Sequence, residues 1–121
     1  MRQLLIPLED LLIVLYEANR TYAAILEEYH DLPWIETTHE CHESLTKGVT
    51  AVLTGSTPEQ LHNQWWAEKI MQGWSYGPVK STSKKTHPYA RPWWDLTLPQ
   101  QLKDTLFHAI VTAFSLEKNG E

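Results

Sequence analysis

Four helix-start signals and their apolar stripes most constrain the fold of this 121-residue chain. "TPEQ" at 57–60 and "TLPQ" at 97–100 place a capping threonine three residues before a glutamine, which is the capping-box pattern. "TTHE" at 37–40 offers the same pattern with Thr37 and Glu40. Pro7, followed by Glu9 and Asp10, predicts the start of a first helix. Apolar residues at three- and four-residue spacing follow each signal, so we predict a mainly α fold with four principal helices.

The predicted helices end at recognisable stops. The first carries Leu11, Leu15, Ala18, Tyr22, Leu26 and Tyr29 and should end at "HDLP", because the residue before a proline disfavours helix. The second and third should run to Gly55 and Gly73. Between the third and fourth helices, "WSYG" and "KTHPYARPWW" predict a short β-hairpin joined by the polar "KSTSKK".

An internal echo suggests how the helices are organised. "PWIETTHECHESLTKGVTAVL" from residue 33 resembles "PWWDLTLPQQLKDTLFHAIVTAF" from residue 92. We therefore predict one domain over 1–121, built from two pseudo-symmetric helix pairs. Residues 1–56 form a degenerate half-repeat, 57–116 a specialised one, and 117–121 a frayed tail.

Charge is unevenly distributed along the chain. Residues 1–56 hold nine acidic and three basic side chains, whereas 57–121 hold six acidic and seven basic ones. Between Lys69 and Trp94 there are five basic residues and no acidic one. A local basic window in an acidic chain predicts a site for a small anion, and argues against a nucleic-acid-binding face.

Aromatic side chains gather in and just before this window, since five of the six tryptophans lie between residues 65 and 94. A nucleotide needs cationic donors for its phosphate and flat rings for its base. The candidate ligand-binding residues are Trp66, Lys69, Trp74, Tyr76, Lys84, Lys85, His87, Arg91, Trp93 and Trp94. The alternative interpretation is that these rings fill a small core and that the lysines are solvated.

Catalytic and metal-binding patterns are weak. "HECHE" at 39–43 places two histidines on one helical face, but its spacing departs from the His-Glu-x-x-His motif, and ordinary surface residues are the preferred interpretation. Pairing of Cys41 with a neighbouring histidine as a nucleophile has no other support. Because the basic window contains no carboxylate beside His87, we expect a non-enzymatic protein without a metal or cofactor.

The stretch from residue 61 to 104 resembles the RyR repeat, a module found in pairs in ryanodine receptors and singly in bacterial and phage proteins. The matching positions are His62, Trp65, Lys69, Gly73, Trp74, Tyr76, Gly77, Pro78, Val79, Lys84, Lys85, His87, Pro88, Pro92, Leu96, Lys103 and Asp104. The chain departs from the pattern at Asn63, Ser81, Arg91 and Trp94, changes that remove acids and add a base. The first half also resembles the N-terminal extension of phage-borne relatives.

This resemblance implies a small helical fold with a short sheet and no established catalytic chemistry. Bacterial and phage relatives of this type are linked to nucleotide-derived signals. We therefore expect a binder of a cyclic ADP-ribose-like molecule or a cyclic dinucleotide, acting as a phage sponge that sequesters a host immune signal. The alternatives are a protein-interaction module that uses exposed tryptophan and arginine side chains, and, less favoured, a nucleotide phosphodiesterase.

Compartment and assembly follow from simpler features. The chain has one cysteine and shows neither a signal-peptide pattern nor an apolar run of membrane-spanning length. We expect a cytoplasmic protein, in the host bacterium if phage-encoded, with no membrane or nucleic-acid partner. The acid-free aromatic surface favours a homodimer or higher homo-oligomer.

Overall fold

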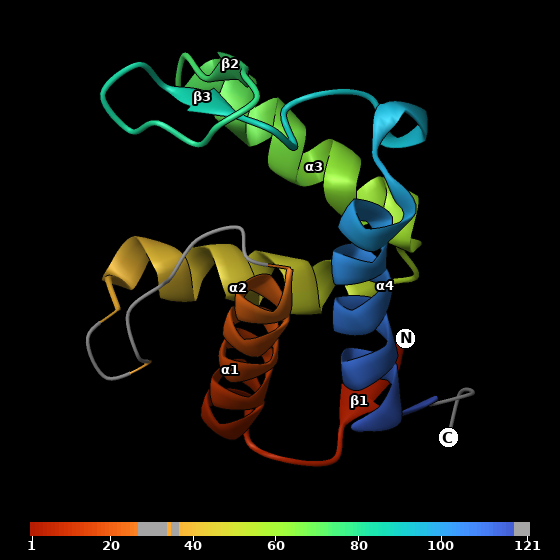
Figure 1. The fold of residues 1–121 in the computed structure, drawn as a ribbon. Coiled ribbons are helices and arrows are strands. Elements are labelled where there is room, and N and C mark those ends of the chain that lie inside the picture. The colour runs from red at the N-terminus through yellow and green to blue at the C-terminus, as the bar shows by residue number, and fades with distance from the viewer. Residues whose placement is uncertain (27–33, 35–36, 118–121) are drawn as a thin grey trace.

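The computed structural model describes residues 1–26, 34 and 37–117. The elements within them are β1 (Arg2–Leu4), α1 (Leu8–Ile25), α2 (His39–Leu53), α3 (Pro58–Met71), β2 (Ser75–Tyr76), β3 (Thr86–His87), the 3-10 turn η2 (Trp93–Asp95), α4 (Leu98–Ala113) and β4 (Ser115–Glu117). α1 and α4 stand side by side, α2 crosses them, and α3 lies above α2 against the upper part of α4 (Figure 1). The mainly α fold with four helices is confirmed.

Two of the predicted helix starts have the expected capping geometry. Thr57 and Gln60 form a reciprocal capping box, in which the Thr57 side chain accepts from the Gln60 N–H at 3.2 Å and the Gln60 side chain accepts from the Thr57 N–H at 2.8 Å. Thr97 and Gln100 repeat it at 3.3 and 3.0 Å. Each box satisfies two backbone donors that would otherwise lack a partner.

The prediction that Thr37 caps α2 is wrong. The N-cap is Thr38, whose Oγ1 accepts from the Cys41 N–H at 3.3 Å. The Thr37 hydroxyl instead donates to the Trp34 carbonyl at 2.6 Å and lies 2.7 Å from His42 Nε2. The Thr37 hydroxyl is thus bonded to Trp34, so Thr38 caps the helix instead.

The core lies where the four helices meet. Its buried members are Leu11, Leu12, Leu15, Val49, Ala51, Val52, Leu61, Phe107 and Val111. Gly48 lets α2 pack closely against α4, because a Cβ there would lie 2.8 Å from Phe107 Cζ. The predicted end of α1 at "HDLP" and the position of Tyr29 lie outside the described residues, and α1 is described to Ile25. In the described part of the chain, no helix has the length and apolar character needed to cross a membrane.

The predicted β-hairpin is also wrong in its pairing. β2 and β3 pair in parallel, with Ser75 opposite Thr86 and Tyr76 opposite His87. The chain reverses its direction between Ser81 and Thr86, which form a separate antiparallel bridge. Thr86 therefore lies between two chain segments, and a Cβ on Gly77 would lie only 2.7 Å from its side chain. The chain makes a closed loop here rather than a hairpin (Figure 1).

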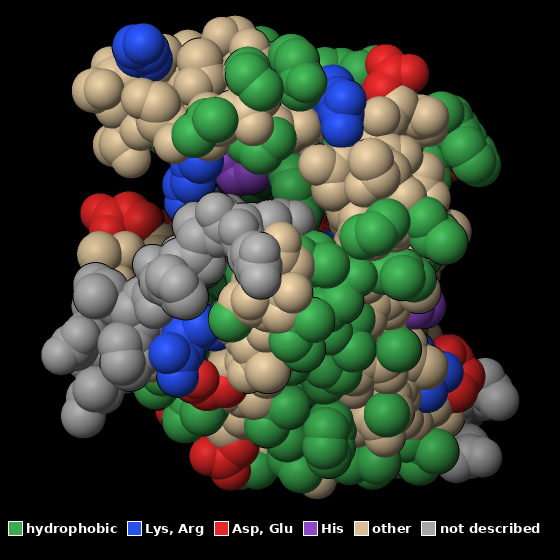
Figure 2. Space-filling model, viewed as in Figure 1, with side chains coloured by type: hydrophobic (Ala, Val, Ile, Leu, Met, Phe, Trp, Pro, Cys, Tyr) green, Lys and Arg blue, Asp and Glu red, His purple; other side chains and the backbone are tan. Residues whose placement is uncertain are grey.

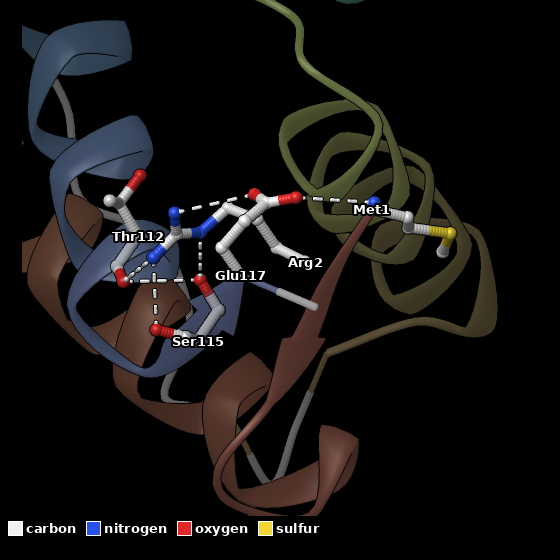
Figure 3. Close-up of polar contacts among 5 residues, drawn as sticks. All are labelled: Met1, Arg2, Thr112, Ser115 and Glu117. Carbon is white, nitrogen blue, oxygen red and sulfur yellow. Dashed lines mark hydrogen bonds and ion pairs between the residues drawn. The ribbon is translucent and has the colours of Figure 1, made fainter. Parts of the chain in front are cut away.

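The antiparallel sheet joins the two ends of the described chain. β1 pairs with β4 from Arg2 opposite Glu117 to Leu4 opposite Ser115. The Arg2 guanidinium donates to Ser115 Oγ at 2.7 Å, to the Ser115 carbonyl at 3.0 Å and to the Thr112 carbonyl at 3.3 Å (Figure 3). Glu117, predicted to begin a frayed tail, belongs to β4 and lies 3.8 Å from Arg2 and 3.3 Å from the Met1 ammonium. Residues 118–121 of that tail lie outside the described residues.

Replacing Arg2 by alanine should lower the free energy of unfolding by about 1–3 kcal/mol, because it removes donors to two backbone carbonyls and a hydroxyl at the end of α4. Urea denaturation measures the change. The matched control is Arg20→Ala, which removes an arginine from a part-exposed ion pair with Glu17 one helical turn away and should cost about 0.5 kcal/mol or less. Equal losses of unfolding free energy for the two variants would contradict a stabilising role for the Arg2 hydrogen bonds to the end of α4.

Candidate functional site

One cavity, with a volume of about 320 Å³, opens between the four helices and the segment that follows β3. The polar side chains that line it within the described residues are Tyr16, Asn19, Cys41, Ser44, Lys47, His62, Gln64, Glu68, His87, Tyr89, Lys103 and Asp104. Leu45, Leu61, Trp65 and Phe107 supply apolar wall. Figure 2 shows a hollow below the β2–β3 loop, with histidine and basic side chains inside it. The cavity therefore combines ring surfaces with titratable groups.

His62 forms part of the cavity wall and is the most buried polar residue of the described chain, with 1% of its surface exposed. Its Nε2 lies 2.6 Å from the Arg91 carbonyl oxygen. Since a carbonyl only accepts, Nε2 carries the proton and Nδ1 presents a lone pair. Burial lowers the pKa of His62, although the bond to Arg91 opposes that shift. The imidazole is therefore neutral and fixed in one tautomer.

His87 is the second buried imidazole in the wall. Its Nδ1 accepts from the Tyr89 N–H at 3.0 Å, so the ring proton is on Nε2. Burial first, and then the ammonium groups of Lys80, Lys69 and Lys103, lower its pKa to about 3. His87 thus stays neutral in the physiological range and donates through Nε2.

Rings and lysines surround His87 on several sides. Trp65 and Tyr89 meet it edge-on, with centroids 4.9 and 5.3 Å away. Lys69 Nζ lies 5.0 Å from the Trp74 ring and 6.0 Å from the Trp65 ring. Lys103 Nζ lies 4.8 Å from the Tyr89 ring. Aromatic faces hold these ammonium groups close to the cavity wall.

Asp104 supplies the carboxyl group that the basic window lacks. It lies on α4, lines the same cavity as His87, and burial raises its pKa to about 7, an effect that neighbouring Lys103 opposes. The expectation of a non-enzymatic protein rested on the absence of a carboxylate near His87 in the sequence. The fold brings Asp104 to the same cavity as His87, so this absence does not hold in the folded protein.

The structure places the ten predicted ligand residues in three settings. Of the ten, only His87 lines the cavity; the Trp74 ring meets His87 edge-on with centroids 6.3 Å apart, and Lys69 Nζ lies 5.0 Å from the Trp74 ring. Trp66 and Trp93 pack against His62, with centroids 6.2 and 6.0 Å away. The others lie on the loop or the surface: Tyr76, stacked 5.1 Å from the Arg91 guanidinium, and Lys84, Lys85 and Trp94, all exposed.

Several cavity residues were missed by the sequence reasoning. Trp65, Tyr89, Lys103 and Asp104 come from three segments separated by up to 39 positions, and only folding joins them. Three of these positions, Trp65, Lys103 and Asp104, belong to the RyR pattern, which was the available signal.

"HECHE" lies on the first turns of α2. His39 and Glu43 form an exposed pair at 3.0 Å. His42 instead stacks on Trp34 with centroids 4.0 Å apart, so it is a packing residue. In the described residues, no three potential metal ligands lie together.

Asp104→Asn should remove a pH dependence of stability. The native carboxyl keeps its proton to about pH 7, whereas the unfolded one loses it near the ordinary value of 3.8. The unfolded state therefore binds fewer protons between these values, and the free energy of unfolding falls as pH rises through this interval. The loss is at most about 4 kcal/mol, and solvent in the cavity reduces it.

Denaturant titrations from pH 4 to pH 8 measure this effect. The asparagine variant should be more stable than the parent at pH 8 and lack the downward slope. Asp95→Asn, which changes an exposed acid on η2, should keep the parent profile. A slope that survives in Asp104→Asn would refute the assignment.

Comparison with known protein families matches residues 42–108 to the RyR domain. No solved structure matched the chain. The matched span begins in α2, earlier than the half-repeat boundary placed at residue 57 from sequence, and ends in α4. It therefore includes all of α3 and most of α2 and α4, and covers more than half of the chain. The chain belongs to the RyR domain family.

Proposed function

We propose that this protein binds a small anionic nucleotide-derived ligand in the cavity, without catalysing its conversion. The observation that carries the proposal is the surroundings of His87: a neutral imidazole in the cavity wall, approached by the ammonium groups of Lys69, Lys80 and Lys103. Such a cluster attracts a phosphate, and the neutral Nε2–H is a directed donor for a polar group of the ligand.

The ring surfaces of the cavity suit a base. Trp65, Tyr89 and Phe107 contribute aromatic wall, and stacking on an aromatic ring contributes roughly 1–3 kcal/mol per base. The volume of about 320 Å³ lies at the lower end of the range for small-molecule sites, roughly 300–1,000 Å³. The cavity therefore has room for a base and part of its ribose, with the phosphate and any second nucleotide near the opening.

The proposed biological role is sequestration in the cytoplasm of a bacterial host. It follows from the RyR resemblance to phage and bacterial proteins and from a cavity whose fixed, neutral histidines suit binding. A cyclic ADP-ribose-like molecule and a cyclic dinucleotide are the ligand classes to test first.

Thermal unfolding with cyclic ADP-ribose and cyclic dinucleotides tests binding, because a ligand at a hundredfold excess over its Kd stabilises the fold by about 2.7 kcal/mol. Lys103→Met keeps an unbranched side chain beside Tyr89 but removes the charge, and should weaken binding about tenfold or more. The matched control, Lys84→Met on the exposed loop, should leave affinity unchanged.

Three outcomes would count against the proposal. No stabilisation by any of these ligands at millimolar concentration refutes nucleotide binding. A loss with Lys84→Met but not with Lys103→Met moves the site from the cavity to the loop. Recovery of a cleaved ligand after heat denaturation, as judged by mass spectrometry, indicates an enzyme rather than a sponge.

A protein-interaction role is the second candidate, and exposed apolar side chains favour it. Trp94, Leu98 and Leu102 are 78%, 66% and 41% exposed at four-residue intervals. Tryptophan is enriched among residues that dominate binding energy at interfaces. Trp94→Ala should abolish self-association in analytical ultracentrifugation if this surface joins two copies, while leaving nucleotide affinity unchanged. Unaltered self-association in the variant excludes this surface as the interface.

A further inference from the structure

Asp104 has an unsatisfied carboxyl group that faces a ligand-sized cavity. Among the described residues, it forms neither a hydrogen bond nor an ion pair, although it lines the cavity. In the same part of the chain, Arg91 Nε is the one side-chain polar atom that is both enclosed and without a partner. The Asp104 oxygens therefore keep accessible surface, and a molecule in the cavity can reach them.

The two histidines of the wall have fixed hydrogen-bonding roles. His87 presents Nε2–H, because its Nδ1 is occupied by the Tyr89 N–H. His62 has its Nε2–H committed to the Arg91 carbonyl and retains only an acceptor nitrogen. The cavity thus offers a donor at His87 and acceptors at Asp104, in a wall that also contains flat rings.

A guanine edge has the complementary arrangement. Its N1–H and 2-amino group are adjacent donors that a single carboxylate can accept together, and its O6 accepts from a donor. Adenine presents one donor beside one acceptor, which a carboxylate cannot match at both positions. We infer that Asp104 is the base-reading residue of this site and that it selects a guanine-containing nucleotide. This inference rests on the proposed function.

Charge favours the same orientation. A phosphate is repelled by ionised Asp104 and attracted by the ammonium groups of Lys69 and Lys80 near His87, so the base, not the phosphate, contacts Asp104. The other titratable or charged groups that face the cavity are Tyr16 on α1, Cys41 and Lys47 on α2, His62 and Glu68 on α3, His87 and Tyr89 after α3, and Lys103 on α4. Lys47 is paired with Glu68 at 3.2 Å, and neither histidine is charged near neutrality.

A pH effect accompanies this selection. Two donors from the base stabilise the ionised carboxyl, whose pKa in the empty cavity is raised to about 7 by burial. Guanine binding therefore requires release of the proton, and affinity should rise as the pH rises from 6 to 8. The affinity for a base that is bound by the protonated carboxyl would instead fall as the pH rises from 6 to 8.

Calorimetric titration of the full chain with GMP, IMP and AMP tests the inference. Affinity should fall in that order, since IMP lacks the 2-amino group and AMP lacks both donors. GMP should exceed AMP by roughly tenfold to a hundredfold, the discrimination expected of a bidentate pair. Asp104→Asn should remove or invert this preference, because the amide offers one donor and one acceptor, which suits adenine.

Asp95→Asn is the matched control and should keep the preference of the parent chain. The pH dependence of GMP affinity, with its accompanying proton release, should be present in the parent and absent from Asp104→Asn. Binding of AMP at least as tight as that of GMP, or a guanine preference that survives Asp104→Asn, overturns the inference and leaves nucleotide binding intact. Failure of all three nucleotides and of the cyclic ligands to bind refutes the proposed function itself.

Discussion

The hydrogen bond from His62 to the Arg91 carbonyl is the contact on which the site depends. It buries an imidazole at 1% exposure and ties α3 to the segment that leads into α4. From that carbonyl, short bonds run back along the chain: the Arg91 N–H donates to the Tyr89 carbonyl at 2.8 Å, and the Tyr89 N–H donates to His87 Nδ1 at 3.0 Å. One buried bond therefore sets the positions of the residues that line the upper part of the cavity, and an unmade one would leave a buried polar group at a cost of about 1–3 kcal/mol.

The burial of these residues also explains why positive charge and directed hydrogen bonds come from different side chains. Burial keeps both imidazoles neutral, so they act as fixed donor and acceptor groups. Positive charge comes from lysines whose ammonium groups lie over aromatic rings, as with Lys69 over Trp74 and Lys103 over Tyr89. Directed bonds supply specificity inside the cavity, while ammonium groups near His87 supply attraction for an anion.

The sequence predicts what local chemistry decides. Thr57 and Thr97 cap their helices as expected, since each box needs only four consecutive residues. Prediction from local sequence fails where two residues can fill the same role, as Thr37 and Thr38 can for the N-cap. It also fails where a contact with a distant residue decides the structure. The direction of the β2–β3 pairing depends on the Ser81–Thr86 bridge, and the β1–β4 sheet joins strands of three residues from opposite ends of the described chain. The cavity is harder still to predict, because its wall combines residues from all four helices, including Asp104 on α4. The predicted ligand residues all came from one continuous stretch, residues 66–94.

Arg91 shows why a departure from the family pattern is a weak guide to a ligand site. Its Nη2 donates at 2.8 Å to Gln100 Oε1, the same atom that accepts from the Thr97 N–H at 3.0 Å. Its guanidinium stacks on Tyr76, and its Nε is enclosed. Arg91 therefore extends the capping box of α4 and anchors the β2–β3 loop to it, so its guanidinium is engaged within the protein. By contrast, His62, His87 and Asp104 match the family pattern and line the cavity. The residues that define the fold are thus also those that could contact a ligand, and the departures adjust the frame beside them.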